Sequence, residues 1–200
     1  MKVVNLSTSP PYRSRSRLGI LALLLPAFLV FLTACAPVAL PDPQGGAGSL
    51  LIGGCEFHWL PRGGAKKGGI EIVLEELVSG GRYQGTTDVE GHYFISNAPP
   101  GVYMLSLVKF NLSEGATVEV EYEPDVKLFY VSPGKVHYQG RMIVEVDKSD
   151  IRRDFKYYAY EKFIAGDLRV EEIKKLVAAR RGNSEWLQKE ISPENELERF

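Results

Sequence analysis

The chain has 200 residues, with 24 basic and 25 acidic side chains and a formal charge of −1. A chain of this length holds one domain with a buried core. Residues 35–200 carry 20 basic and 25 acidic side chains, and this mildly acidic balance without a basic stripe argues against a nucleic-acid partner. Its two cysteines provide no disulfide framework, so packing must hold the fold together.

Residues 1–34 have the pattern of a secretory signal peptide. Four basic residues and no acidic residue precede Cys35, and an apolar run extends from Leu18 to Leu32. This order of charge, apolar run and small residues predicts a cleaved signal peptide. The run is too short for a permanent span, because about 15 residues at about 1.5 Å each reach about 22 Å of a roughly 30 Å hydrocarbon core.

The end of that run, Leu32-Thr33-Ala34-Cys35, resembles the lipobox of bacterial lipoproteins. The resemblance implies cleavage between Ala34 and Cys35, a thioether-linked diacylglycerol on Cys35 and acylation of the freed amine. Two or more acyl chains give stable membrane anchoring. Ala36, where lipoproteins kept at the inner membrane carry aspartate, implies an outer membrane facing the periplasm, if the host has one. The alternative is an ordinary signal peptide without lipidation.

Residues 35–48 are expected to form a flexible tether between lipid and domain. The stretch 36–48 is rich in proline, glycine and alanine and has one charge. Such a composition forms no core of its own. At about 3.3 Å per residue the tether would reach about 40 Å.

Residues 49–148 show the alternation and turn signals of a β-sandwich. Residues 82–87 and 92–96 are expected to form a hairpin, in which Asp88 hydrogen-bonds the turn backbone and Gly91 adopts a positive φ. Cys55 lies in an apolar context and is expected to be a buried small hydrophobe rather than a reactive thiol. About seven short antiparallel strands at this spacing predict a mainly β fold with two packed sheets. A Gly/Lys loop is expected at 61–69, and the other strands at 50–60, 70–75, 103–107, 117–122, 126–131 and 136–146.

Residues 149–200 change character and predict a C-terminal α-helical extension. The first helix is indicated by apolar side chains at helical spacing, namely Phe155, Tyr158, Ala159 and Phe163. A second helix is expected from a cap at Asp167 to Gly182, and a short third turn from Ser184. Their apolar faces should pack on the sandwich or on a partner.

Two motifs in the middle of the chain resemble the signature of carboxypeptidase regulatory-like domains. They are Thr87-Asp88-Val89-Glu90-Gly91-His92-Tyr93-Phe94 and Asn97-Ala98-Pro99-Pro100-Gly101-Val102-Tyr103, within a match over about Ile70 to Phe110. The resemblance implies a transthyretin-like sandwich, with Asp88, Gly91, Pro100, Gly101 and Tyr103 as turn and fold residues. It implies no catalysis, because this is the non-catalytic part of those carboxypeptidases, and such modules occur in many proteins. Ser132 to Gly140 also resembles a strand-turn-strand of small bacterial envelope lipoproteins.

The sequence offers no complete set of catalytic or metal-binding residues. The metal hypothesis uses His58, His92 and His137, with Glu56 or Glu71. These histidines fall on separate expected strands, and no HxxE, HExxH or HxH pairing is present, so no metal or other cofactor is predicted. A G-x-S-x-G nucleophile motif is also missing. The chain is therefore expected not to be an enzyme.

The sequence favours a lipid-anchored cell-envelope protein that acts as a non-catalytic structural or protein-interaction module. Its expected partners are the membrane, through the lipid, and an envelope protein. One alternative is a carbohydrate or peptidoglycan binding module that uses Trp59, Tyr83 and Tyr93 on one exposed face; burial of these aromatics would remove that version. The other alternative is a metal-dependent hydrolase built on the three histidines.

Overall fold

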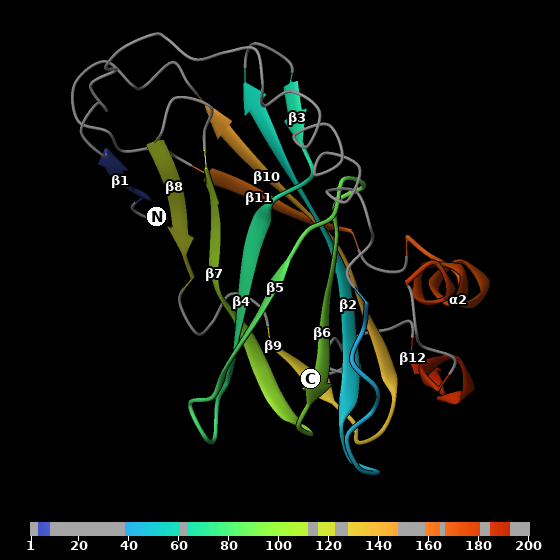
Figure 1. Ribbon diagram of the computed structural model, residues 1–200. Helices are drawn as coiled ribbons and strands as arrows, with labels where there is room; N and C mark the ends of the chain where they lie inside the picture. The colour runs from blue at the N-terminus through green and yellow to red at the C-terminus, as the bar shows by residue number, and fades with distance from the viewer. Residues whose placement is uncertain are drawn as a thin grey trace, which may run out of the picture.

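The computed structural model describes residues 4–8, 39–60, 64–111, 116–122, 128–147, 159–164, 167–180 and 185–192. The expected cleavage and lipidation site at Ala34 and Cys35 lies outside these residues. Two sheets pack face to face, and a helical segment near the C-terminus covers the outside of one of them (Figure 1). The predicted mainly β sandwich with a C-terminal helix is confirmed. No helix within the described ranges is long and apolar enough to cross a membrane.

The first sheet is antiparallel throughout. Its order is β1 (Val4–Thr8), β8 (Ala116–Glu121), β7 (Gly101–Asn111), β4 (Ile70–Glu76) and β5 (Arg82–Thr86), and β9 (Leu128–Val131) also pairs with β7. Strand β5 is therefore at one edge of this sheet.

The second sheet is built around a parallel pair of long strands, β2 (Ser49–Leu60) and β10 (Val136–Asp147). The chain between them visits the first sheet twice, for β4–β5 and for β7–β9, and such crossover connections are what a parallel pair requires. Antiparallel partners flank the pair: β6 (His92–Ala98) and β3 (Gly64–Lys66) on β2, and β11 (Ala159–Ile164) on β10. The short β12 (Ile191–Ser192) adds a parallel bridge to β10.

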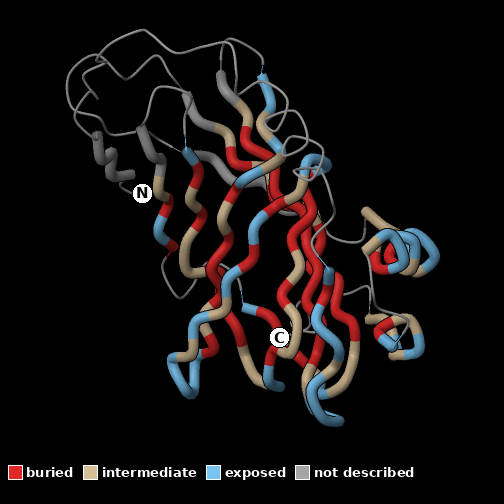
Figure 2. Tube along the Cα trace, in the orientation of Figure 1, coloured by how far each residue is buried: buried red, intermediate tan, exposed pale blue. Residues whose placement is uncertain are grey.

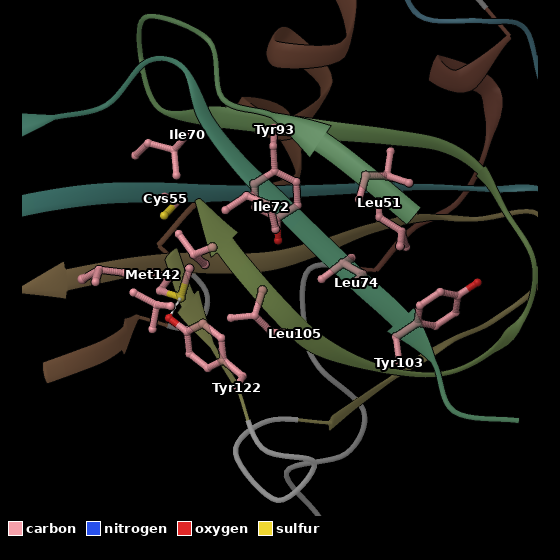
Figure 3. Close-up of a cluster of buried hydrophobic side chains, with 14 of the residues drawn as sticks. Leu51, Cys55, Ile70, Ile72, Leu74, Tyr93, Tyr103, Leu105, Tyr122 and Met142 are labelled. Carbon is pink, nitrogen blue, oxygen red and sulfur yellow. Dashed lines mark hydrogen bonds between the residues drawn. The ribbon is translucent and has the colours of Figure 1, made fainter. Parts of the chain in front are cut away.

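The main core lies between the sheets and follows from the period-2 alternation of both. Figure 3 shows side chains from both sheets meeting there, including Cys55 and Met142 from the second sheet and Ile72 and Leu105 from the first. Buried residues run along the strands, while turns and the outer side of the helix are exposed (Figure 2). Burial raises the pKa of the Cys55 thiol, with the Glu56 charge adding to the effect. The expectation that Cys55 is a buried small hydrophobe is confirmed.

The expected hairpin between residues 82–87 and 92–96 is wrong, because its arms belong to different sheets. Strand β5 pairs with β4, whereas β6 pairs with β2. The turn itself contains the expected contacts: the Asp88 carboxylate accepts the N–H of Glu90 and of His92, each at 2.9 Å, and Gly91 has φ +91°. The Cys55 N–H donates to Gly91 O at 2.8 Å and fastens this turn to β2. The turn thus carries the chain across the sandwich.

The prediction of a first C-terminal helix is wrong for residues 159–164, which form the strand β11. This strand pairs from Arg141–Ile164 to Val146–Ala159 along the edge of β10. An unpaired edge of a long central strand leaves a row of backbone groups without partners, so pairing overrides a helical spacing that is only local. Phe155 and Tyr158 lie outside the described residues.

The second expected helix is present as α2 (Val170–Ala178), but it begins after Arg169 rather than at a cap on Asp167. The Arg169 N–H donates to the Glu172 carboxylate at 2.8 Å, so the N-terminal turn is capped by its own third residue. A 3₁₀ turn, η1 (Trp186–Gln188), follows where the third short turn is expected. Ile173 and Val177 of α2 are buried against the outer face of the second sheet, so this helix packs on the sandwich.

Two segments expected to be loose are ordered. Part of the Gly/Lys loop forms β3, which pairs with residues 57–59 of β2. Residues 39–48 of the expected tether lie on the domain and are held by hydrogen bonds with Asn97 and Trp186.

Candidate functional site

A cleft of about 580 Å³ lies beside β5 and β6. These strands leave their shared turn and diverge, because each follows its own sheet (Figure 1). The cleft is therefore a direct product of the crossover turn at residues 87–91. Its walls are residues 39–41, residues 84–88, Phe94, Ser96 and Arg180.

The first wall is the N-terminal segment, residues 39–48, which the sequence predicts to be a tether. Leu40 is only 8% exposed and packs in a second apolar cluster outside the second sheet. The Trp186 indole Nε1–H donates to Pro41 O at 2.9 Å. That cluster also contains Leu50, Ile52, Val136, Tyr138, Ile173, Val177 and Trp186.

Asn97 holds the same segment from β6. It sits at a register shift of the β2–β6 pair with φ +59°, a left-handed conformation that asparagine tolerates better than most side chains. Its Oδ1 accepts the Gln44 N–H at 2.6 Å, and its Nδ2 donates to Asp42 O at 3.1 Å. The N-terminal segment is thus fixed both to β6, through Asn97, and to η1, through Trp186.

The second wall joins the crossover turn to the chain after α2. The Arg180 guanidinium pairs with the Asp88 carboxylate, and its Cζ lies 4.2 Å from the centre of the Phe94 ring. The pair cancels both charges, and the arginine covers the aromatic face by a cation–π contact. The sequence gives no signal for this contact, because Asp88 and Arg180 are 92 residues apart.

The third wall is β5. Hydrogen bonds at both ends of the β4–β5 pair show which residues of β5 direct their backbone N–H and C=O groups toward β4. The Thr87 N–H donates to Ile70 O at 2.8 Å, and the Glu76 N–H donates to Gly81 O at 2.8 Å. In an antiparallel pair, bonded and non-bonded residue pairs alternate. Odd-numbered residues of β5 therefore bond to β4, and even-numbered residues direct their backbone groups away from it.

Arg82, Gln84 and Thr86 consequently present backbone N–H and C=O groups to the free edge of β5. No strand pairs with this edge among the residues that the structure describes. Gln84 and Thr86 are exposed and line the cleft, whereas Arg82 does not line it. The cleft is thus bordered by an open strand edge, uncharged side chains and one internally neutralised ion pair.

A polar cluster fastens the chain before α2 to the second sheet. Asp167 accepts the Tyr138 hydroxyl at 2.6 Å and the Arg141 Nε–H at 3.0 Å. Side chains three residues apart on a regular strand face opposite sides, but the register shift between Tyr138 and Arg141 inserts one extra residue. The bulge puts both side chains on the face that α2 covers.

Glu56 extends this cluster on the same face. Its carboxylate pairs with Arg141, with Lys67 Nζ at 3.2 Å and with His58 Nε2 at 3.3 Å. Burial raises the pKa of this carboxyl, but the hydrogen bonds from His58 and Lys67 and the charge of Arg141 outweigh burial and leave the pKa below its ordinary value. The cluster is satisfied by its own members, which is the arrangement of a structural ion-pair network.

The three histidines of the metal hypothesis have separate environments. His58 contacts Glu56, His137 Nε2 lies 3.1 Å from Ser132 O, and His92 is buried beside the crossover turn. In the described part of the chain, no group of three His, Cys, Asp or Glu side chains is arranged to hold a metal ion.

The aromatic trio of the carbohydrate hypothesis does not form an exposed platform. Tyr93 is 6% exposed, and its hydroxyl donates to Gln139 Oε1 at 3.1 Å inside the core. Tyr83 is half-buried and meets Tyr103 edge-on at 5.6 Å. The Trp59 side chain lies outside the described residues. Burial of Tyr93 removes this version of a sugar-stacking surface.

The remaining motif residues lie at the β6–β7 turn. Tyr103 is fully buried, and its hydroxyl donates to Pro99 O at 2.7 Å, which ties the turn of Pro100 and Gly101 to the core. A Cβ on Gly101 would lie 2.8 Å from Glu76 Oε1, so a side chain at this position would displace the Glu76 carboxylate. These residues position strands and do not line the cleft.

Stability should depend on pH through His92. Neither ring nitrogen has a hydrogen-bond partner among the described residues, and Nδ1 is 4.0 Å from the Asp88 carboxylate. Burial is the largest effect on the pKa of His92 and lowers it. The charge of Asp88 raises this pKa, that of Arg141 lowers it, and those of Glu90 and Asp167 raise it, and the net result is a lowered pKa.

The folded protein therefore holds His92 neutral at pH values where the unfolded chain, with a pKa near 6.5, already binds a proton. We expect the stability that depends on neutral His92 to be complete above about pH 7. The free energy of unfolding should then fall as the pH drops toward the folded-state pKa of His92, by at most about 1.4 kcal/mol per pH unit. Urea unfolding between pH 7.5 and 5.5 measures this slope. His92→Leu should flatten it; an unchanged slope in that variant would assign it to other groups.

No protein-family model matches the sequence, and no curated protein is significantly similar to it. A crystal structure from Pseudomonas aeruginosa, provisionally described as a carbohydrate-binding protein, is similar at 13% identity and a TM-score of 0.32. The match covers 52% of this chain and 91% of that chain. A likeness at this level carries no argument about ligand or function.

Proposed function

We propose that this chain is a lipid-anchored cell-envelope protein that acts without catalysis, as an interaction module for an extended segment of another envelope protein. The Leu32–Cys35 motif supports the anchor and a place at the outer membrane, facing the periplasm, in a host that has one. Cleavage before Cys35 would remove β1, so β8 would then be the edge strand of the first sheet at the end opposite β5. The observation that carries the binding proposal is the free hydrogen-bonding edge of β5 inside the cleft.

An extended peptide adds to an exposed strand edge through main-chain hydrogen bonds, while neighbouring pockets select its side chains. The cleft has a volume within the ordinary range of binding pockets, roughly 300–1,000 Å³. Residues 39–41 and Arg180 line the same cleft, so a segment that pairs with this edge would also contact them. Gln84 and Thr86 supply the outward backbone groups that such a segment would bond.

The test uses a photo-crosslinking residue at Thr86 in the full-length protein in its native envelope. Gln84→Pro removes an outward N–H without breaking a bond to β4, since proline is tolerated where the strand N–H faces solvent. We expect Gln84→Pro to reduce the cross-linked peptide by about tenfold or more. Arg82→Pro, on the same edge but outside the cleft, should leave the product unchanged, as should Gln84→Ala, which keeps the backbone group.

A neutral glycan is the second candidate for the same cleft. It is favoured by an amide and two hydroxyls, on Gln84, Thr86 and Ser96, which offer donors and acceptors without a net charge. A glycan would bond these side chains rather than the backbone edge. A cross-linked product that contains sugar, and that is lost in Gln84→Ala, would therefore support the glycan and contradict strand addition.

A further inference from the structure

We propose that the cleft stands at the lipid surface and takes an extended segment that a partner presents next to the membrane. This inference rests on the proposed function, because it uses both the lipid on Cys35 and the binding edge of β5. It goes further by fixing where the partner segment must be.

The distance from the anchor to the cleft is short. Ala39 lines the cleft, and only residues 36–38 separate it from Cys35. Four residue steps span at most about 14 Å even when fully extended. A tether that stayed free through residue 48 would reach about 40 Å. Because Ala39 can lie no further than about 14 Å from Cys35, the cleft wall that it forms is kept close to the lipid.

The limit on the distance between Cys35 and the cleft holds only if the N-terminal segment stays bound to the domain, and several contacts hold it there. Leu40 is buried in the apolar cluster under Trp186, and the Trp186 indole bonds the next carbonyl, that of Pro41. Asn97 then bonds the backbone of Asp42 and of Gln44. Successive contacts on one short stretch make peeling from the lipid end unfavourable.

The charge of the cleft is compatible with this placement. Gln84 and Thr86, on its exposed wall, are uncharged, and Asp88 is neutralised by Arg180. The cleft therefore carries no net charge that a phospholipid surface would repel or attract. The anchor and its short connection alone set the position.

The placement is testable with the full-length lipidated protein in phosphatidylethanolamine–phosphatidylglycerol vesicles. A fluorophore is attached at Thr86→Cys in the cleft or, as the matched control, at Val78→Cys, which is 89% exposed in the turn at the other end of β5. The native Cys55 is buried and does not compete for the label. A nitroxide on the lipid headgroup should quench the label at position 86 and leave that at position 78 bright. Equal quenching at both positions would overturn the proposal.

A spacer variant separates placement from binding. Twelve Gly/Ser residues inserted between Val38 and Ala39 add a root-mean-square span of about 19 Å. Quenching at position 86 should fall to the control level, and the Thr86 cross-link in native membranes should fall several-fold. A cross-link that the spacer leaves unchanged would overturn the membrane-adjacent segment but leave the binding edge intact. Conversely, a cross-link insensitive to Gln84→Pro, with quenching preserved, would remove the proposed function and not the placement.

Discussion

Replacing Gly53 by alanine should destabilise the sandwich by about 2–3 kcal/mol, the upper part of the range for overpacking a core. Gly53 pairs with Tyr93 across β2 and β6, and the tyrosine ring lies over it. A Cβ at Gly53 would lie 2.3 Å from the Tyr93 hydroxyl oxygen and 2.4 Å from Cζ. No heavy-atom contact is that short, so the ring or the strand must move.

The ring has little freedom to move. Tyr93 is buried in the core between the sheets, and its hydroxyl is bonded to Gln139. Shifting the ring would break that bond and force the neighbouring core side chains to repack. The cost therefore comes from the closed surroundings of Tyr93 rather than from the backbone preference of Gly53.

Urea unfolding measures the effect, and Gly46→Ala is the matched control. A Cβ on Gly46 meets no atom within 4 Å, so this change should cost almost nothing. In a double-mutant cycle, Gly53→Ala combined with Tyr93→Leu should cost less than the sum of the two single changes. Equal stability of the Gly53→Ala and Gly46→Ala variants would contradict the close contact.

The strands and the crossover turn were predictable because their signals are local. Alternating apolar residues predict β4 and β7. A turn of this kind uses an aspartate that accepts backbone hydrogen bonds and a glycine with positive φ, and this predicts the roles of Asp88 and Gly91. Which sheet each arm joins is not local. A turn of the same chemistry closes a hairpin or crosses a sandwich, and the choice depends on whether β6 finds its partner in β5 or in β2.

The same limit explains the C-terminal error. Phe155, Tyr158, Ala159 and Phe163 have helical spacing, yet residues 159–164 form β11, because the edge of β10 offers a ladder that spacing does not reveal. Asp167 has the chemistry of a helix cap but is recruited by Tyr138 and Arg141.

The candidate cleft is the least predictable part, because its walls come from distant segments. Its ion pair joins Asp88 and Arg180, which are 92 residues apart in the sequence. Its N-terminal wall comes from a stretch whose composition indicates a flexible linker. Proline and glycine in residues 39–48 signal the absence of regular structure. They do not signal the absence of contacts, which Leu40 and the backbone carbonyls of Pro41 and Asp42 make.

Trp186→Ala should remove about 3–5 kcal/mol of packing free energy, the usual cost of truncating a buried aromatic side chain. Trp186 is fully buried and is among the largest such side chains in the described residues. It packs against Leu40 and the α2 cluster and bonds Pro41. The loss should therefore fall on two segments together: residues 39–42 and α2.

Hydrogen exchange on the folded protein resolves this distribution. In Trp186→Ala, amides of α2 should exchange much faster, while those of β4 and β7, which face the other core, should keep their protection. Trp186→Phe is the control, because it keeps a buried six-membered ring and loses the rest of the indole with its bond to Pro41 O, so it should cost clearly less than Trp186→Ala. Uniform loss of protection across both sheets would show that the outer cluster is part of one cooperative core. Selective loss would mean that the N-terminal cleft wall depends on a single tryptophan of the C-terminal segment, and so would the proposed short connection to a lipid on Cys35.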